Sequence, residues 1–72
     1  MLTQKIVSST IDHITFHAGE MTVAFKSGNR YRYAEVPIKI YFGMGVSKKP
    51  GTYYGTNIKK KFKSRKLNPG EI

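Results

Sequence analysis

Apolar and polar residues alternate through the first half of the chain, as they do in strands that are buried on one face. The alternation is clear in residues 14–16, 21–25 and 31–33. Because successive side chains of a strand point to opposite faces, each segment gathers its apolar residues on one side. The residues between the segments, 18–20 and 27–29, have the Gly, Ser and Asn composition of turns. The pattern predicts an antiparallel meander.

The opposite face of this predicted sheet is polar. Before the first strand, residues 6–9 predict either an additional edge strand or a loop, so the sheet has three or four strands. The positions that we expect on the polar face are Thr15, His17, Thr22, Ala24, Lys26, Arg30 and Arg32.

The apolar spacing becomes helical after Pro37, a residue that suits the first turn of a helix. Gly43 and Gly45 each cost about 1 kcal/mol in a helix interior, so this helix should be short and held by packing. Residues 48–51 predict a break. Thr52 is a candidate cap for a second helix, whose apolar stripe is Tyr54, Ile58 and Phe62.

These elements predict an α+β fold: a three- or four-stranded antiparallel β-meander followed by two short helices packed on one face. A chain of 72 residues forms one domain, for which we expect residues 1–66. Residues 67–72 should form a short flexible C-terminal tail. The expected core comprises Ile14, Phe16, Val23, Phe25, Tyr33, Ile58 and Phe62.

Charge is the most unusual property of the composition. Thirteen Lys and Arg residues face four acidic ones, which gives a net charge of +9, and residues 48–66 hold eight of the basic residues without any acid. No acidic residue in that segment offers the helix ion pairs that would explain so many lysines, so we expect a surface for polyanions. The candidate nucleic-acid-binding residues are Lys48, Lys49, Lys59, Lys60, Lys63, Arg65, Lys66, Arg30 and Arg32.

The tyrosines of the third strand have two interpretations. Tyr31 and Tyr33 flank Arg32, and aromatic residues on a strand stack on bases in several RNA-binding folds. They also lie on the apolar side of their strand, which favours a place in the core.

Catalytic and metal chemistry finds little support. The chain has no cysteine, and its only histidines, His13 and His17, would lie about 13 Å apart on a strand, too far to share a metal ion. Phosphate-binding glycine loops are absent as well. We therefore expect no enzyme, no cofactor and no metal site. The lack of cysteine and of a long apolar segment leads us to expect a cytoplasmic protein without a membrane partner.

The order of these motifs over residues 7–62 resembles the KTSC domain, a family of about sixty residues named for its occurrence at the C-terminus of some lysyl-tRNA synthetases. Small stand-alone bacterial and phage proteins also contain it. Gly55 departs from the Asn that the family often has, and the basic segment after Phe62 extends beyond it. The residues that carry the resemblance are Val7-Ser8-Ser9, Ile11, Ile14, Phe16, Phe25, Gly28, Tyr31-Arg32-Tyr33, Val36-Pro37, Ser47, Gly51, Tyr53-Tyr54, Ile58 and Phe62.

Three functions follow from these observations. The first is a small basic nucleic-acid-binding module that uses mainly backbone contacts, with RNA favoured over DNA because the resemblance implies a synthetase context. The second is a phage or mobile-element interaction factor that binds an acidic protein surface of host machinery. The third is a structural domain whose charge is incidental. The resemblance implies no catalytic residue.

Overall fold

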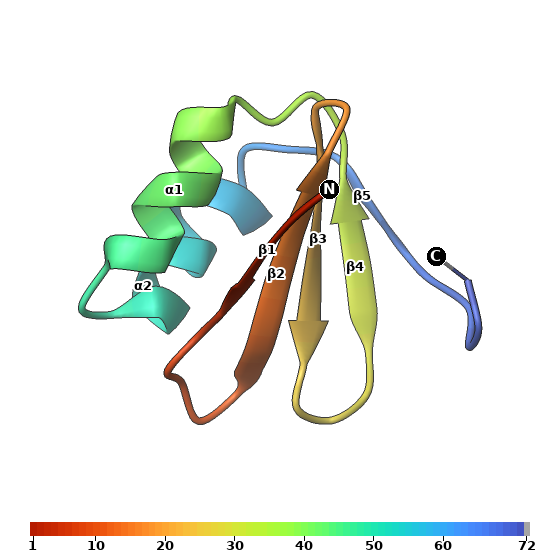
Figure 1. The fold of residues 1–72 in the computed structure, drawn as a ribbon, viewed down its shortest axis with the longest axis horizontal. Coiled ribbons are helices and arrows are strands. Elements are labelled where there is room, and N and C mark those ends of the chain that lie inside the picture. The colour runs from red at the N-terminus through yellow and green to blue at the C-terminus, as the bar shows by residue number, and fades with distance from the viewer. Residues whose placement is uncertain (72) are drawn as a thin grey trace.

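One antiparallel sheet with a helical layer on a single face makes up the computed structural model, which describes residues 1–71 (Figure 1). The sheet has five strands in the order β1-β2-β3-β4-β5. The strands are β1 (Leu2–Lys5), β2 (Ile11–His17), β3 (Glu20–Phe25), β4 (Arg30–Tyr33) and β5 (Ser64–Lys66). The helical segments are α1 (Ile38–Val46), α2 (Pro50–Tyr54) and η1 (Gly55–Lys59), the last a turn of π-helix that continues α2.

The structure confirms the α+β class, the central meander and the helices on one face. It adds two edge strands to the three predicted by alternation. β1 lies at residues 2–5, upstream of the candidate segment 6–9, and β5 returns after the helices to pair with β4.

Two tight turns hold the central meander in register. Ala18 and Gly19 both have positive φ angles, 51° and 80°, which is the conformation of the hairpin turn that matches strand twist. Gly28 adopts a φ of 101° in the second turn, where the N–H of Phe25 donates to the carbonyl oxygen of Asn29 at 2.9 Å. Both turns were anticipated from composition, and together they align the inward residues of β2, β3 and β4.

A β-bulge in β2 gives the core one residue more than alternation allows. The pairing of β2 with β3 shifts register between Ile11 and His13, which places an extra residue at Asp12. As a result Ile11 and Ile14 both point into the core, with 1% and 0% of their surfaces exposed. Residues three apart on a regular strand would face opposite sides.

The helices approach each other closely because α1 contains glycine. A Cβ atom at Gly43 would collide with the hydroxyl of Tyr53 in α2. That hydroxyl instead donates to the carbonyl oxygen of Ile40 at 3.1 Å. The helix penalty of Gly43 is therefore offset by close packing between α1 and α2.

The second helix differs from its prediction at both ends. It begins at Pro50 with Lys49 as the cap residue, because proline suits the first helical position, and Thr52 lies inside the helix. At its other end the helical segment stops at Lys59, before Phe62, the last residue of the predicted stripe. The N–H of Phe62 still bonds to the carbonyl oxygen of Ile58, and residues 64–66 then extend along the open edge of β4. Arg65 and Lys66 are thus on a strand, where their backbone groups find partners.

The segment after Lys66, predicted as a tail, begins with a packed residue. Leu67 is buried, and its N–H donates to the carbonyl oxygen of Arg30 at 2.9 Å. The packed part of the chain therefore reaches at least one residue beyond the predicted domain boundary.

The core lies between the sheet and the helices. Of the seven predicted core residues, Ile14, Val23, Tyr33 and Ile58 are buried, whereas Phe16, Phe25 and Phe62 are partly buried and pack against them. The other buried residues of this core, which were not among those predicted, are Ile6, Ile11, Met21, Val36, Tyr41 and Met44.

Both tyrosines of β4 pack on the helix side of the sheet. The hydroxyl groups of Tyr33 and Tyr54 are hydrogen-bonded, and the ring of Tyr31 meets Phe25 edge-on with a centroid distance of 5.9 Å. The interpretation of these residues as packing residues is therefore correct, and neither lies on the uncovered face.

Removing the side chain of Ile58 should unfold a large fraction of the molecules. Ile58→Ala is expected to lower the free energy of unfolding by about 2–5 kcal/mol, because Ile58 is fully buried between the layers. Val7→Ala, at a side chain that is 94% exposed, should change it by less than ~0.5 kcal/mol. Denaturant titration followed by circular dichroism measures both, and equal effects would contradict this description of the core.

Candidate nucleic-acid interface

The face of the sheet away from the helices is polar and uncovered, and strand pairing arranges its side chains in rows. Paired residues of neighbouring strands point to the same face, so the register alone defines these rows. The longest row crosses all five strands and consists of Thr3, Thr15, Thr22, Arg32 and Arg65.

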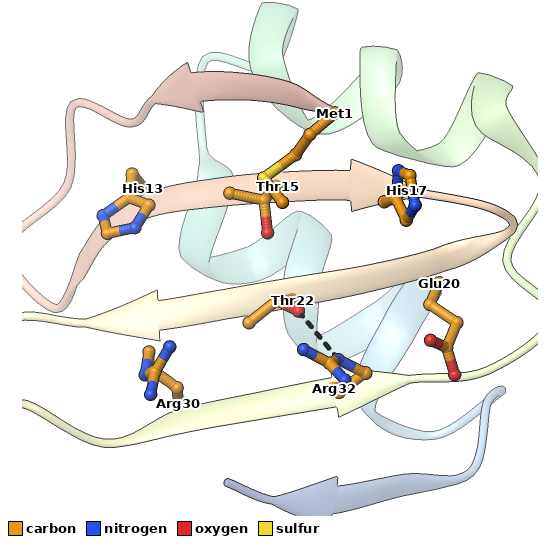
Figure 2. Close-up of a pocket in the computed structure, with 8 residues that line it drawn as sticks. All are labelled: Met1, His13, Thr15, His17, Glu20, Thr22, Arg30 and Arg32. Atoms are coloured by element: carbon orange, nitrogen blue, oxygen red, sulfur yellow. Dashed lines mark hydrogen bonds between the residues drawn. The ribbon is translucent and has the colours of Figure 1, made fainter. Parts of the chain in front are cut away.

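A second row runs beside it through four strands. It consists of Lys5, His13, Ala24 and Arg30. The small residue Ala24 lies between the longer side chains of His13 and Arg30, and the surface is hollowed here. Figure 2 shows the hollow with its residues projecting from one side of the strands while the helices lie behind them.

This hollow is smaller than a typical ligand pocket. Its volume is about 250 Å³, below the roughly 300–1,000 Å³ of typical small-molecule sites. Its lining combines two arginines, two threonine hydroxyl groups and two imidazole rings with one carboxylate, that of Glu20, so the cations outnumber the anion. The lining residues are Met1, His13, Thr15, His17, Glu20, Thr22, Arg30 and Arg32.

The arginines of this face already hold oxygen atoms of the chain itself. The Nε atom of Arg32 donates to the Thr22 hydroxyl at 3.4 Å (Figure 2). The guanidinium of Arg30 donates to the carbonyl oxygen of Glu71, and that of Arg65 donates to the carboxylate of the same residue. One C-terminal acidic residue therefore spans two arginines from adjacent strands.

The contact with Arg65 also governs the ionisation of Glu71. The guanidinium lowers the pKa of the Glu71 carboxyl to about 2, with help from the N–H of Asn68, which donates to the carboxylate at 3.0 Å. The chain itself thus supplies an anionic group, the Glu71 carboxylate, at the edge of the arginine row.

The predicted binding residues separate into two groups. The sheet-face arginines Arg30, Arg32 and Arg65 lie together on the uncovered face. Lys63 joins them, since it lines a neighbouring hollow of about 220 Å³ with Arg32 and Arg65.

The remaining predicted residues do not join this group. Lys66 pairs with Tyr31, whose side chain packs on the helix side, so Lys66 belongs to that side. The others, which we call the helix-layer lysines, are Lys48 and Lys49 between α1 and α2, and Lys59 and Lys60 at the end of η1, next to Lys61.

Sequence reasoning missed two contributors to the uncovered face. Lys5 was not predicted to lie on this face, because no strand was expected at residues 2–5 and hence no pairing of Lys5 with β2. Glu71 lay in the predicted tail. A signal was present in both cases: β1 ends in a cation, and Glu71 is the only acid after residue 35.

Of the two histidines of β2, His13 contacts a carboxylate of the chain and His17 is exposed to solvent. The Nδ1 atom of His13 lies 2.7 Å from a carboxylate oxygen of Asp12, and this contact lowers the pKa of Asp12. Within residues 1–71, no group of three His, Cys, Asp or Glu residues is placed to hold a metal ion. Among the helices of the same residues, none is long and apolar enough to cross a membrane.

The Glu71 carboxyl should titrate far below an ordinary glutamate. Its pKa is depressed from 4.5, so the contact with Arg65 is complete above that value and is lost as the pH falls towards 2. Carboxyl chemical shifts measured by NMR should show a midpoint near 2, which Arg65→Gln returns towards 4.5 and Lys60→Gln leaves unchanged. An ordinary midpoint in the unmodified protein would rule out the contact.

Comparison with known proteins agrees with this architecture. The KTSC domain family matches residues 7–62. The crystal structure of a KTSC domain protein from Yersinia pestis superimposes with a TM-score of 0.82 and 26% sequence identity, covering 93% of this chain and 97% of that one. No curated protein matches the chain. The family match spans most of the sequence, including the meander and both helices, and the chain belongs to the KTSC domain family.

Proposed function

We propose that this protein is a small nucleic-acid-binding module that holds the phosphate backbone of single-stranded RNA on the uncovered face of its sheet. The observation that carries the proposal is the position of Arg30, Arg32 and Arg65 on adjacent strands of that face. Guanidinium groups donate paired hydrogen bonds to phosphate oxygens, and the threonine hydroxyls of the same row add further donors. RNA is favoured over DNA because KTSC domains occur in lysyl-tRNA synthetases.

The absence of aromatic residues from this face determines what kind of contact it makes. In the described strands, no outward position carries Phe, Tyr or Trp. Sheets that read RNA bases stack them on exposed aromatic rings, and here Tyr31 and Tyr33 pack against the helices instead. The proposed contacts are therefore to phosphates, and binding should tolerate many sequences.

Glu71 supports the assignment of the arginines to an anion. Its carboxylate is bound by Arg65 and its carbonyl oxygen by Arg30. A backbone phosphodiester carries the same single negative charge as a carboxylate and likewise presents two strong acceptor oxygens, so the same guanidinium groups can bind it. The RNA backbone is proposed to replace Glu71 on these arginines.

Removing the sheet-face arginines should weaken RNA binding and flatten its salt dependence. For about four to six neutralised phosphates on a single strand, log affinity should fall against log salt with a slope of roughly −3 to −4. The triple variant Arg30→Gln, Arg32→Gln, Arg65→Gln should reduce the slope by about 2, at about 0.7 per contact. Fluorescence anisotropy with a labelled twelve-nucleotide RNA, from about 50 mM salt upwards, measures this change.

A charge-matched variant separates a site from a diffuse field. Lys59→Gln, Lys60→Gln, Lys61→Gln removes an equal number of charges from the end of η1, outside the arginine row, and should keep most of the slope. If both triple variants lose affinity equally, the sheet face is not the site. If the unmodified protein binds neither RNA nor DNA at about 50 mM salt, where backbone contacts are strongest, the proposed function is wrong.

Neutralising Glu71 should strengthen RNA binding. Glu71→Gln frees Arg65 from an exposed ion pair of a kind worth little in water, so affinity should rise by about 1.5- to 5-fold. Glu35→Gln removes one negative charge from the turn before α1 and should give the smaller change expected of net charge alone. Equal gains in the two variants would show that Glu71 does not compete for the site.

A further inference from the structure

Helix α1 carries a second uncovered surface, on the opposite side of the molecule from the arginines. Ile38, Phe42 and Val46 follow one another at intervals of four residues and so form one stripe along the helix. They are 47%, 50% and 82% exposed, respectively. Tyr41 and Met44 on the other side of α1 are buried in the core, so the helix is apolar on two sides.

The fold does not account for this stripe. None of its three residues belongs to the core or to the side chains packed against it. Phe42 meets the ring of Tyr41 at a centroid distance of 5.4 Å, and half of its surface remains exposed. A surface helix normally turns polar residues to solvent, and in α1 only Lys39 does so. Apolar residues that gather in this way mark interaction sites.

Cations rim the stripe at both ends. Lys39 follows Ile38 within the helix, and Lys48 and Lys49 follow Val46 just beyond its end; all three are exposed. The chain has no Asp or Glu from residue 36 to residue 70, so the whole helical layer is free of acids. The nearest acid in sequence is Glu35, before the start of α1. A partner for this surface must therefore offer apolar side chains to the stripe and negative charges to the lysines around it.

We propose that the α1 stripe binds an acidic amphipathic helix of another protein. The apolar face of that helix would cover Phe42 and its two neighbours, and its flanking carboxylates would meet the lysines of the rim. The stripe spans about 12 Å at 1.5 Å per residue, which matches two to three turns with apolar residues three or four apart. A second copy of this chain does not fit, because each copy carries +9 and a symmetric pairing would set the lysine rim of one stripe against the lysine rim of the other.

This surface acts independently of the proposed RNA site. The stripe and the sheet-face arginines lie on opposite sides of the core, and they share no residue. The protein then has one face for an RNA backbone and one for an acidic protein, and a failure of either assignment leaves the other unaffected.

Selection from a random peptide library displayed on phage tests this proposal, with the full chain as bait. The parallel bait is Phe42→Ser, which is expected to fold because the side chain lies outside the core; thermal melting checks this. The unmodified protein should enrich peptides with apolar residues three or four apart flanked by Asp or Glu. A synthetic peptide of the enriched sequence should bind Phe42→Ser or Val46→Ser at least tenfold more weakly.

Two further variants distinguish binding at the stripe from nonspecific hydrophobic binding. Val7→Ser changes an apolar residue that is more exposed, at 94%, but lies between β1 and β2, and it should leave peptide affinity unchanged. Lys39→Gln, Lys48→Gln, Lys49→Gln should weaken binding and flatten its salt dependence.

Several outcomes overturn the proposal. One is enrichment on the unmodified bait that is no greater than on Phe42→Ser, and another is the selection of peptides without acids. A dimer in sedimentation that Phe42→Ser dissociates would show that a second copy covers the stripe. Binding to phosphatidylglycerol vesicles that is lost in Phe42→Ser, without any enriched peptide, would assign the stripe to an anionic membrane.

Discussion

One-sided burial is the constraint on which the rest of this structure depends. A chain of 72 residues contains enough material for one sheet and one helical layer, and small domains leave a large part of their surface in water. All three helical segments cover a single face, because the large apolar side chains of β2, β3 and β4 lie there. The other face remains in contact with water and therefore carries polar side chains: threonines, histidines and arginines. The candidate RNA site is thus a product of the same alternation that makes the core.

Strand pairing turns this polar face into an ordered array. Arg32 and Arg65 are 33 residues apart in sequence, yet the β4–β5 register places them opposite each other. Arg30 lies two residues from Arg32, which puts it on the same face. The Glu71 contacts show that these guanidinium groups converge on acceptor oxygens. The helix-layer lysines lie outside this array, in the connection between α1 and α2 and at the end of η1.

Sequence patterns predicted the parts of this protein that follow a regular period. Alternation identified the meander and placed Tyr31 and Tyr33 with the core, and composition located both turns. Irregular features could not be predicted in this way. The bulge at Asp12 breaks the period of two, and β5 reads only as Ser-Arg-Lys, which has no apolar residue to mark a face. The charge run suggested one basic surface. The charge run alone does not indicate that the helix ends near Phe62. Lys60 therefore lies in the helical layer, whereas Arg65 lies in the sheet, opposite Arg32.

The short last strand makes assembly of the arginine row a folding event in its own right. β5 consists of three exposed residues attached to β4 at an edge, and the buried apolar side chain that anchors it is that of Leu67, directly after the strand. Such edges open locally at a lower free energy than the core. When β5 detaches, Arg30 and Arg32 remain in place on β4, whereas Arg65 leaves. Any ligand that needs all three arginines therefore binds only molecules with β5 docked and, by mass action, holds that strand in place. The strength of binding and the local stability of this C-terminal edge are then two measures of one equilibrium.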